Sequence, residues 1–187
     1  MIKLKKIVNE IIDAAPPSRP TSHDVRQSQS ESFSSDFINY IKSVENGIGV
    51  GYDKKKKLWF PHRSYEGGMP TIGYGHKVKN AQELESFKKG ISNSAVLKLL
   101  ETDLSVANRR VHDYIKKKYG IDLMLTKKQN EMLTDFAFNL GGLDKFPKFT
   151  DAVLRNKWDV VKKEYIRKAG GRDLKGRNTA FYNRFLR

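Results

Sequence analysis

The sequence predicts an α+β fold, with a small antiparallel β region and a larger set of helices. Residues 48–76 contain many glycines, tyrosines and turn signals, a composition typical of short antiparallel strands. From Ser92 to the C-terminus, apolar residues instead recur at intervals of three and four, which is the helical period. Because the two patterns occupy separate parts of the chain, the β region is expected to be segregated from the helices.

The first 35 residues differ from the rest of the chain. Residues 1–13 predict a short amphipathic helix whose apolar face consists of Leu4, Ile7, Val8, Ile11 and Ile12. A helix this short cannot bury such a face alone, so residues 1–12 are a candidate docking segment. Residues 14–35 are rich in proline, serine and glutamine and predict a flexible linker. The globular domain is therefore expected over residues 36–187.

A helix is expected at the start of this domain. Its apolar face would consist of Phe37, Ile38, Ile41 and Val44. Asp36 or Ser35 can cap its N-terminus, and Asn46 with Gly47 would end it.

The downstream helices follow from capping residues. Ser92 can cap one helix, and Thr126 with Gln129 forms a capping box for the next, which the two glycines at 141–142 would end. Two further helices are expected, at about residues 150–168 and at 178–186.

Composition excludes several kinds of chemistry. The chain has no cysteine, which excludes disulfides, thiolate metal sites and cysteine nucleophiles. Its four histidines lack metal-ligand spacing, so neither a metal nor another cofactor is expected. No apolar run is long enough to span a membrane. Glu10 and Asp13 interrupt the first apolar stretch, so no signal peptide is expected.

The net charge is +15, of which +14 lies on residues 36–187. A field of this size attracts polyanions such as nucleic acids, acidic cell-wall polymers or anionic membranes. No nucleic-acid recognition motif is present, so no specific nucleic-acid partner is expected.

Hydrolysis of a glycosidic bond requires two carboxyl groups, one to protonate the leaving oxygen and one to act at the anomeric carbon or on the attacking water. The acid must remain protonated near neutral pH, and burial at the end of an apolar helix favours this. Glu45 follows Val44 at the C-terminal end of the first expected helix, where the helix dipole also disfavours ionisation. By itself, a glutamate at a helix end is more often a solvated surface residue.

Residues 71–76 read Thr-Ile-Gly-Tyr-Gly-His and resemble the TIGxGH signature of phage lysozymes, the glycoside hydrolase family that includes the T-even phage endolysin. Three later segments resemble that family in the same order, namely residues 136–142, the Trp-Asp pair at 158–159 and residues 169–176. The resemblance implies a lysozyme-like fold, with an active-site cleft between a small β lobe and a larger helical lobe. It also implies that Glu45 is the general acid and that Thr71 lies beside the attacking water.

The second carboxylate has two candidates, because Glu45 and Thr71 are 26 positions apart, farther than is usual in the family. Glu66 lies five positions before Thr71, close to the place of the family's aspartate, and is the preferred candidate. Asp53 follows Tyr52, as in the family's Tyr-then-Asp order, and is the alternative. The extra residues, which include the lysines at 54–57, predict an extended hairpin or loop.

The resemblance implies further site residues. His76 is expected to form a structural ion pair with Asp103, and Arg177 is a candidate to pair with the acid glutamate. The candidate substrate-binding residues are Tyr74, Asn139, Gly142 and Arg177. His62 could influence Glu66, although an ordinary loop histidine is the simpler interpretation.

These features predict an inverting N-acetylmuramidase, expected to be monomeric, that cleaves the β-1,4 bond of bacterial peptidoglycan. It would be located in the host cytoplasm and released to the periplasm and cell wall, or be carried on the virion. An alternative makes the protein chiefly a virion or tail component, docked through residues 1–12. A third hypothesis, a nucleic-acid-binding protein, is suggested by charge alone.

Overall fold

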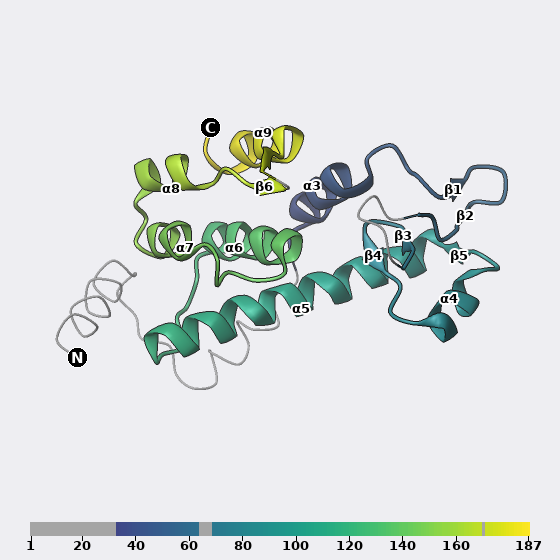
Figure 1. Cartoon of the computed structure of the whole chain (residues 1–187), viewed down its shortest axis with the longest axis horizontal. Helices are drawn as coiled ribbons and strands as arrows, with labels where there is room; N and C mark the ends of the chain where they lie inside the picture. The colour runs from purple at the N-terminus through teal and green to yellow at the C-terminus, as the bar shows by residue number, and fades with distance from the viewer. Residues whose placement is uncertain (1–32, 64–68, 170) are drawn as a thin grey trace. The chain divides into compact units, whose positions relative to one another are not determined.

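The structure is a computed structural model that describes residues 33–63, 69–169 and 171–187. The predicted N-terminal helix, nearly all of the predicted linker, and Glu66 lie outside the described residues. The described chain forms two compact units, Ser34–Val106 and Ala107–Arg187. Short antiparallel strands and a helical majority confirm the predicted α+β class (Figure 1).

The first unit begins with helix α3, Ser35–Asn46. Its N-cap is Ser34, whose hydroxyl accepts a hydrogen bond from the Phe37 amide at 3.2 Å. The expectation that Asp36 or Ser35 would cap it was therefore wrong by one or two residues. Phe37 and Ile41 are fully buried, as the apolar pattern predicts.

Among the described residues, four short strands lie in the predicted β region or at its end, and a fifth, at residues 91–92, lies beyond it and was not predicted. Strands β1 (Tyr52–Asp53), β2 (Leu58–Trp59) and β5 (Ile91–Ser92) form an antiparallel sheet in the order β1-β2-β5. Strands β3 (Thr71–Ile72) and β4 (His76–Lys77) form a separate hairpin. The residues inserted between Glu45 and Thr71 therefore include a β1–β2 hairpin, as predicted.

Helix α4, Ala81–Phe87, was not predicted, because none of its seven residues is fully buried and its apolar contact is limited to partly buried residues such as Phe87. Capping stabilises it. The Asn80 side chain accepts a hydrogen bond from the backbone amide of Glu83 at 2.9 Å, and the Glu83 carboxylate accepts one from the backbone amide of Lys79 at 2.6 Å.

The long helix α5, Asn93–Tyr119, contributes residues to both units. Ser92 caps it as predicted, since its hydroxyl accepts from the Ala95 amide at 3.2 Å. In the first unit, Val96 of α5 packs with Trp59 and Ile72 in a small buried core. This core places β2, β3 and the start of α5 against one another (Figure 1).

In the second unit, helix α6 (Lys127–Leu140) starts at the predicted Thr126–Gln129 capping box and ends at Gly141, which has a φ of 79°. The single helix expected at residues 150–168 is instead two helices, α7 (Pro147–Leu154) and α8 (Trp158–Glu164). Asn156 between them has a φ of 55°, a left-handed conformation that a continuous helix cannot contain.

The chain ends with a short hairpin and a helix. Strands β6 (Lys168–Ala169) and β7 (Arg172–Asp173) precede helix α9, Lys175–Phe185, which begins three residues before the expected start. Phe136 of α6 is the centre of this unit's core, with ring centroids 3.7 Å from Phe149 and 5.3 Å from Phe181. Within the described parts of the chain, no helix has the length and apolarity needed to cross a membrane.

Candidate active site

The structure brings Glu45 to the turn that carries the TIGYGH motif. Glu45 lies in the last turn of α3 and is partly exposed. Gly75, in the turn between β3 and β4, has a φ of 89°, and a Cβ atom there would lie 3.4 Å from Glu45 Oε2. The carboxylate therefore lies in van der Waals range of the backbone of this turn, and the positive φ of Gly75 favours glycine there.

Asn46 holds the end of α3 to the same turn. Its Nδ2 donates to the carbonyl oxygens of Gly73 at 2.7 Å and Val50 at 2.9 Å, and its Oδ1 accepts from the Val50 amide at 2.8 Å. The side chain is 8% exposed, so these bonds are sheltered from water. From the sequence, Asn46 was only a helix-ending residue. No motif indicates this role, because Gly73 is 27 positions away.

Thr71 is 9% exposed and is the first residue of β3. Its backbone pairs with His62 in both directions, at 2.8 and 2.9 Å. Its hydroxyl oxygen lies 3.5 Å from His62 Nδ1. His62, for which an ordinary loop position was the simpler interpretation of the sequence, thus contacts the predicted site residue Thr71.

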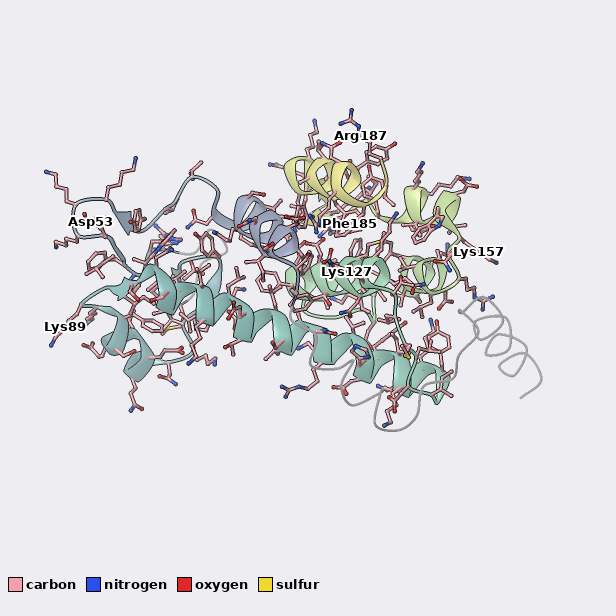
Figure 2. All side chains as sticks on the ribbon, turned by 180° about the vertical axis from the view of Figure 1, so that it is seen from behind. Asp53, Lys89, Lys127, Lys157, Phe185 and Arg187 are labelled. Carbon is pink, nitrogen blue, oxygen red and sulfur yellow. The ribbon has the colours of Figure 1, made fainter. Side chains whose placement is uncertain are left out.

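Asp53 closes the turn of the β1–β2 hairpin. Its Oδ1 accepts hydrogen bonds from the amides of Lys55 at 2.9 Å and Lys56 at 3.0 Å. Figure 2 shows Asp53 at this turn, where the neighbouring lysine side chains are exposed. An aspartate here has a structural reason, which weakens the motive for assigning it a catalytic one.

Tyr74 of the motif is half-buried and packs on Trp59, with ring centroids 5.2 Å apart. The Lys42 ammonium lies 5.5 Å from the centre of its ring. Burial raises the pKa of Tyr74 above its usual value, so its hydroxyl is neutral at physiological pH and can donate a hydrogen bond.

His76 is 5% exposed and lies between two carboxylates. Its Nδ1 is 2.7 Å from Asp103 Oδ2, which brings together the two residues of the predicted pair, and its Nε2 is 3.4 Å from Glu83 Oε1. The hydrogen bond to Asp103 raises the pKa of His76 above 6.5, against the opposing effect of burial. The hydrogen bond from the Lys79 amide is the main cause that lowers the pKa of Glu83 below 4.5. The sequence did not reveal the contact with Glu83.

Replacing Asp103 with asparagine should destabilise the protein in a pH-dependent way. Because the pKa of His76 is higher in the folded state, its ion pair stabilises the fold fully at pH values below 6.5, the pKa of histidine in the unfolded chain. This stabilisation is lost as the pH rises through the pKa of His76 in the folded state. The lowered pKa of Glu83 stabilises the fold at pH values above 4.5, the pKa of glutamate in the unfolded chain. Both residues therefore stabilise the fold between pH 4.5 and pH 6.5. We expect Asp103→Asn to lower the free energy of unfolding by about 2 kcal/mol at pH 6 and by clearly less at pH 9. Urea unfolding at the two pH values measures this, and an equal loss at both would contradict an ionic interaction.

The remaining predicted site residues lie in the second unit. Arg177 of α9 donates to Asp135 Oδ1 at 3.0 Å, while its pairing with Glu45 stays a prediction. The Oδ1 atom of Asn139, near the end of α6, is buried without a hydrogen-bond partner among the described residues. Gly142 is part of the chain that follows this helix. No cluster of potential metal ligands occurs in the described parts of the chain.

A buried charge cluster accompanies Arg177. Asp135 and Arg167 are both completely buried, and their side chains are 2.9 Å apart. The Arg167 guanidinium carbon lies 4.4 Å from the ring centre of Phe136 and 4.8 Å from that of Phe181. The sequence did not predict this cluster, because arginine rarely occurs in a core and no local pattern marks it.

Comparisons with known proteins agree with this architecture. The sequence model of a family described as phage lysozyme matches residues 60–179, a range that includes Glu66, Thr71 and Asn139 but not Glu45. Peptidoglycan hydrolase gp36 of Enterobacteria phage SP6 is 25% identical over an alignment of 130 residues, and the match covers 60% of this chain and 12% of that protein. The chain thus corresponds to about an eighth of this relative's length.

A solved structure shares the fold. The muramidase domain of SpmX from Asticaccaulis excentricus superposes with a TM-score of 0.52 at 19% identity, covering 83% of this chain and 97% of that one. Because the family match spans well over half of the 187 residues, the chain belongs to the phage lysozyme family of glycoside hydrolases.

Proposed function

We propose that this protein is a peptidoglycan hydrolase that cleaves the β-1,4 bond between N-acetylmuramic acid and N-acetylglucosamine. The observation that carries this proposal is the position of the Glu45 carboxylate against the turn of the TIGYGH motif. Family membership supports the reaction class, and the peptidoglycan hydrolase named above, to which part of this chain is similar, supports the substrate.

In this mechanism, protonated Glu45 donates its proton to the glycosidic oxygen while the bond from that oxygen to the anomeric carbon breaks. A water molecule beside Thr71 attacks the anomeric carbon from the opposite face and transfers a proton to the second carboxylate. The two carboxyl groups exchange protonation states overall, and solvent restores them. Attack by water without a covalent intermediate inverts the anomeric centre. Tyr74, Asn139, Gly142 and Arg177 are the proposed substrate contacts.

We assign the second carboxylate to Glu66, with Asp53 as the alternative. The two hydrogen bonds that Asp53 accepts within its own hairpin support this choice. We therefore expect Glu66→Gln to lower the rate of peptidoglycan clearing by about 100-fold or more. Asp53→Asn should keep most of the activity, because an asparagine oxygen can accept the same two amide bonds. Near-parental activity of Glu66→Gln, with a large loss in Asp53→Asn, would reverse the assignment.

Identification of the product ends tests the proposed function. Purified peptidoglycan is digested with the protein, the products are reduced with borohydride, and the reduced sugars are identified by mass spectrometry. A muramidase produces reduced N-acetylmuramic acid. Reduced N-acetylglucosamine, anhydro sugars, or peptides released without new sugar ends would each contradict the bond assigned here.

The second candidate function is a role on the virion, with residues 1–12 as the docking segment on a flexible tether. The amphipathic pattern of these residues and the linker composition of residues 14–35 support it. The two functions are compatible, since a particle-borne lysozyme would degrade the cell wall during entry. Co-purification with intact particles, lost on deletion of residues 1–12, supports docking. A protein found only in the lysate would be a free lysis enzyme.

A further inference from the structure

We propose that His62 is a positioning residue of this active site, which fixes the direction of the Thr71 hydroxyl. The inference rests on the proposed function, in which Thr71 lies beside the attacking water. Nothing in the sequence motif assigns His62 this role, because His62 precedes the motif by nine residues.

The fold holds the His62 ring in one place. The paired backbones of His62 and Thr71 place the two side chains next to each other at the isolated bridge that includes the first residue of β3. The other edge of the ring packs on Gly51, where a Cβ atom would lie only 2.8 Å from His62 Cδ2. Gly51 also has a φ of 85°, so glycine is required there both for its conformation and for the space that the ring occupies.

The surroundings of Nδ1 determine which ring nitrogen carries the proton. Nδ1 lies 3.3 Å from the carbonyl oxygen of Arg63, which can only accept a hydrogen bond. The proton of neutral His62 is therefore assigned to Nδ1, and the same N–H faces Thr71 Oγ1 at 3.5 Å. Both contacts are long, as catalytic hydrogen bonds commonly are before substrate binds.

This assignment has a consequence for Thr71. When its oxygen accepts from His62, its single hydroxyl hydrogen must point elsewhere and is available to a water molecule. A water that accepts this bond keeps one lone pair for the anomeric carbon and its hydrogens for the second carboxylate. His62 thereby selects the orientation of Thr71 that suits an attacking water.

A second observation points to a ligand on the other side of the ring. His62 Nε2 is buried and has no hydrogen-bond partner among the described residues. In the tautomer assigned above, this nitrogen is an acceptor. Buried acceptors are normally satisfied, so a water or a substrate hydroxyl is expected to donate to it.

A double-mutant cycle tests the inference, with kcat and KM measured on purified peptidoglycan fragments. His62→Phe keeps a ring but removes the donor, and Thr71→Val removes the hydroxyl. We expect His62→Phe to lower kcat about 10-fold, which corresponds to about 1.4 kcal/mol, with little change in KM. In the Thr71→Val background, His62→Phe should lower kcat by less than about 2-fold, because the hydroxyl that His62 orients is absent.

His62→Asn is the conservative variant, because its side-chain amide can place a donor where Nδ1 lies. It should recover most of the lost kcat, whereas His62→Gln, whose amide lies farther along the side chain, should not. The inference would be overturned if the fold-loss of kcat in the double variant equalled the product of the losses in the two single variants. It would also be overturned if His62→Asn and His62→Gln lowered kcat equally. Melting curves of each variant reveal any failure to fold, in which case the asparagine–glutamine comparison decides. If the parent protein itself releases no sugar ends, the proposed function has failed and not the role of His62.

Discussion

The Glu45→Gln variant is expected to clear peptidoglycan about 10²- to 10⁴-fold more slowly than the parent, the range typical of losing a general acid. Glutamine keeps the shape of the side chain but has no acidic proton to give to the leaving oxygen. Glu45 lies at the end of α3 and is partly exposed, so the change should lower the free energy of unfolding by less than about 1 kcal/mol, including any loss of its predicted pairing with Arg177. The loss would therefore belong to the chemical step. Initial clearing rates at equal protein concentration measure it.

Glu85→Gln is the matched control for this variant. Glu85 lies on the short helix α4 in the same unit, is 65% exposed and pairs only with Lys88 among the contacts described. The same substitution there also removes one negative charge, so it tests whether a change in net charge alters binding to an anionic cell wall. We expect parental clearing from Glu85→Gln. Similar losses in both variants would show that charge, and not proton donation, explains the effect.

The Asp135→Asn variant is expected to lose about 3–5 kcal/mol of unfolding free energy, the largest stability effect predicted for this chain. Asp135 and Arg167 are both fully buried and 2.9 Å apart, and Arg177 also donates to Asp135. Removing the only negative charge described in contact with Arg167 leaves a guanidinium in the core between two phenylalanine rings. Ring faces attract a cation by about 1–2 kcal/mol, which is too little to replace the carboxylate. Urea unfolding of the parent and the variant measures the difference.

Two further variants complete this test. Asp173→Asn breaks an ion pair with Lys168 whose side chains are 50% and 62% exposed, and it should cost less than about 1 kcal/mol. The double variant Asp135→Asn with Arg167→Met removes the uncompensated charge and should recover part of the loss. An Asp135→Asn protein as stable as the Asp173→Asn control would contradict the account of the buried pair.

Local signals explain the parts of the fold that could be predicted. The start of α6 depends on Thr126 and Gln129, which are three residues apart, and its end depends on the conformation of Gly141. Both are visible in the sequence. The break between α7 and α8 lies at the left-handed Asn156, whose side chain and the adjacent end of α7 accept hydrogen bonds from the distant Gln129 side chain. The predicted continuous helix therefore failed at that residue.

The residues of the candidate site likewise fall into two groups, those that a local sequence signal predicts and those that depend on distant partners. Glu45, Thr71 and His76 could be proposed because they belong to a motif or precede it at the end of a helix. Asn46 and His62 could not, since their roles depend on partners that the strands and the α3 terminus bring together. Glu83 shows a further reason, because it lies on a seven-residue helix with no fully buried residue, which is too short for a clear helical pattern in the sequence.

The central claim, that Glu45 protonates the leaving oxygen, is tested most directly by changing the leaving group. A peptidoglycan-derived oligosaccharide with a dinitrophenyl aglycone needs little protonation on cleavage, because dinitrophenolate is a stable anion. The parent and Glu45→Gln are compared on this glycoside and on the natural bond. We predict that the Glu45→Gln defect falls by at least about 10-fold on the activated glycoside. An equal defect on both substrates would show that Glu45 is not the general acid.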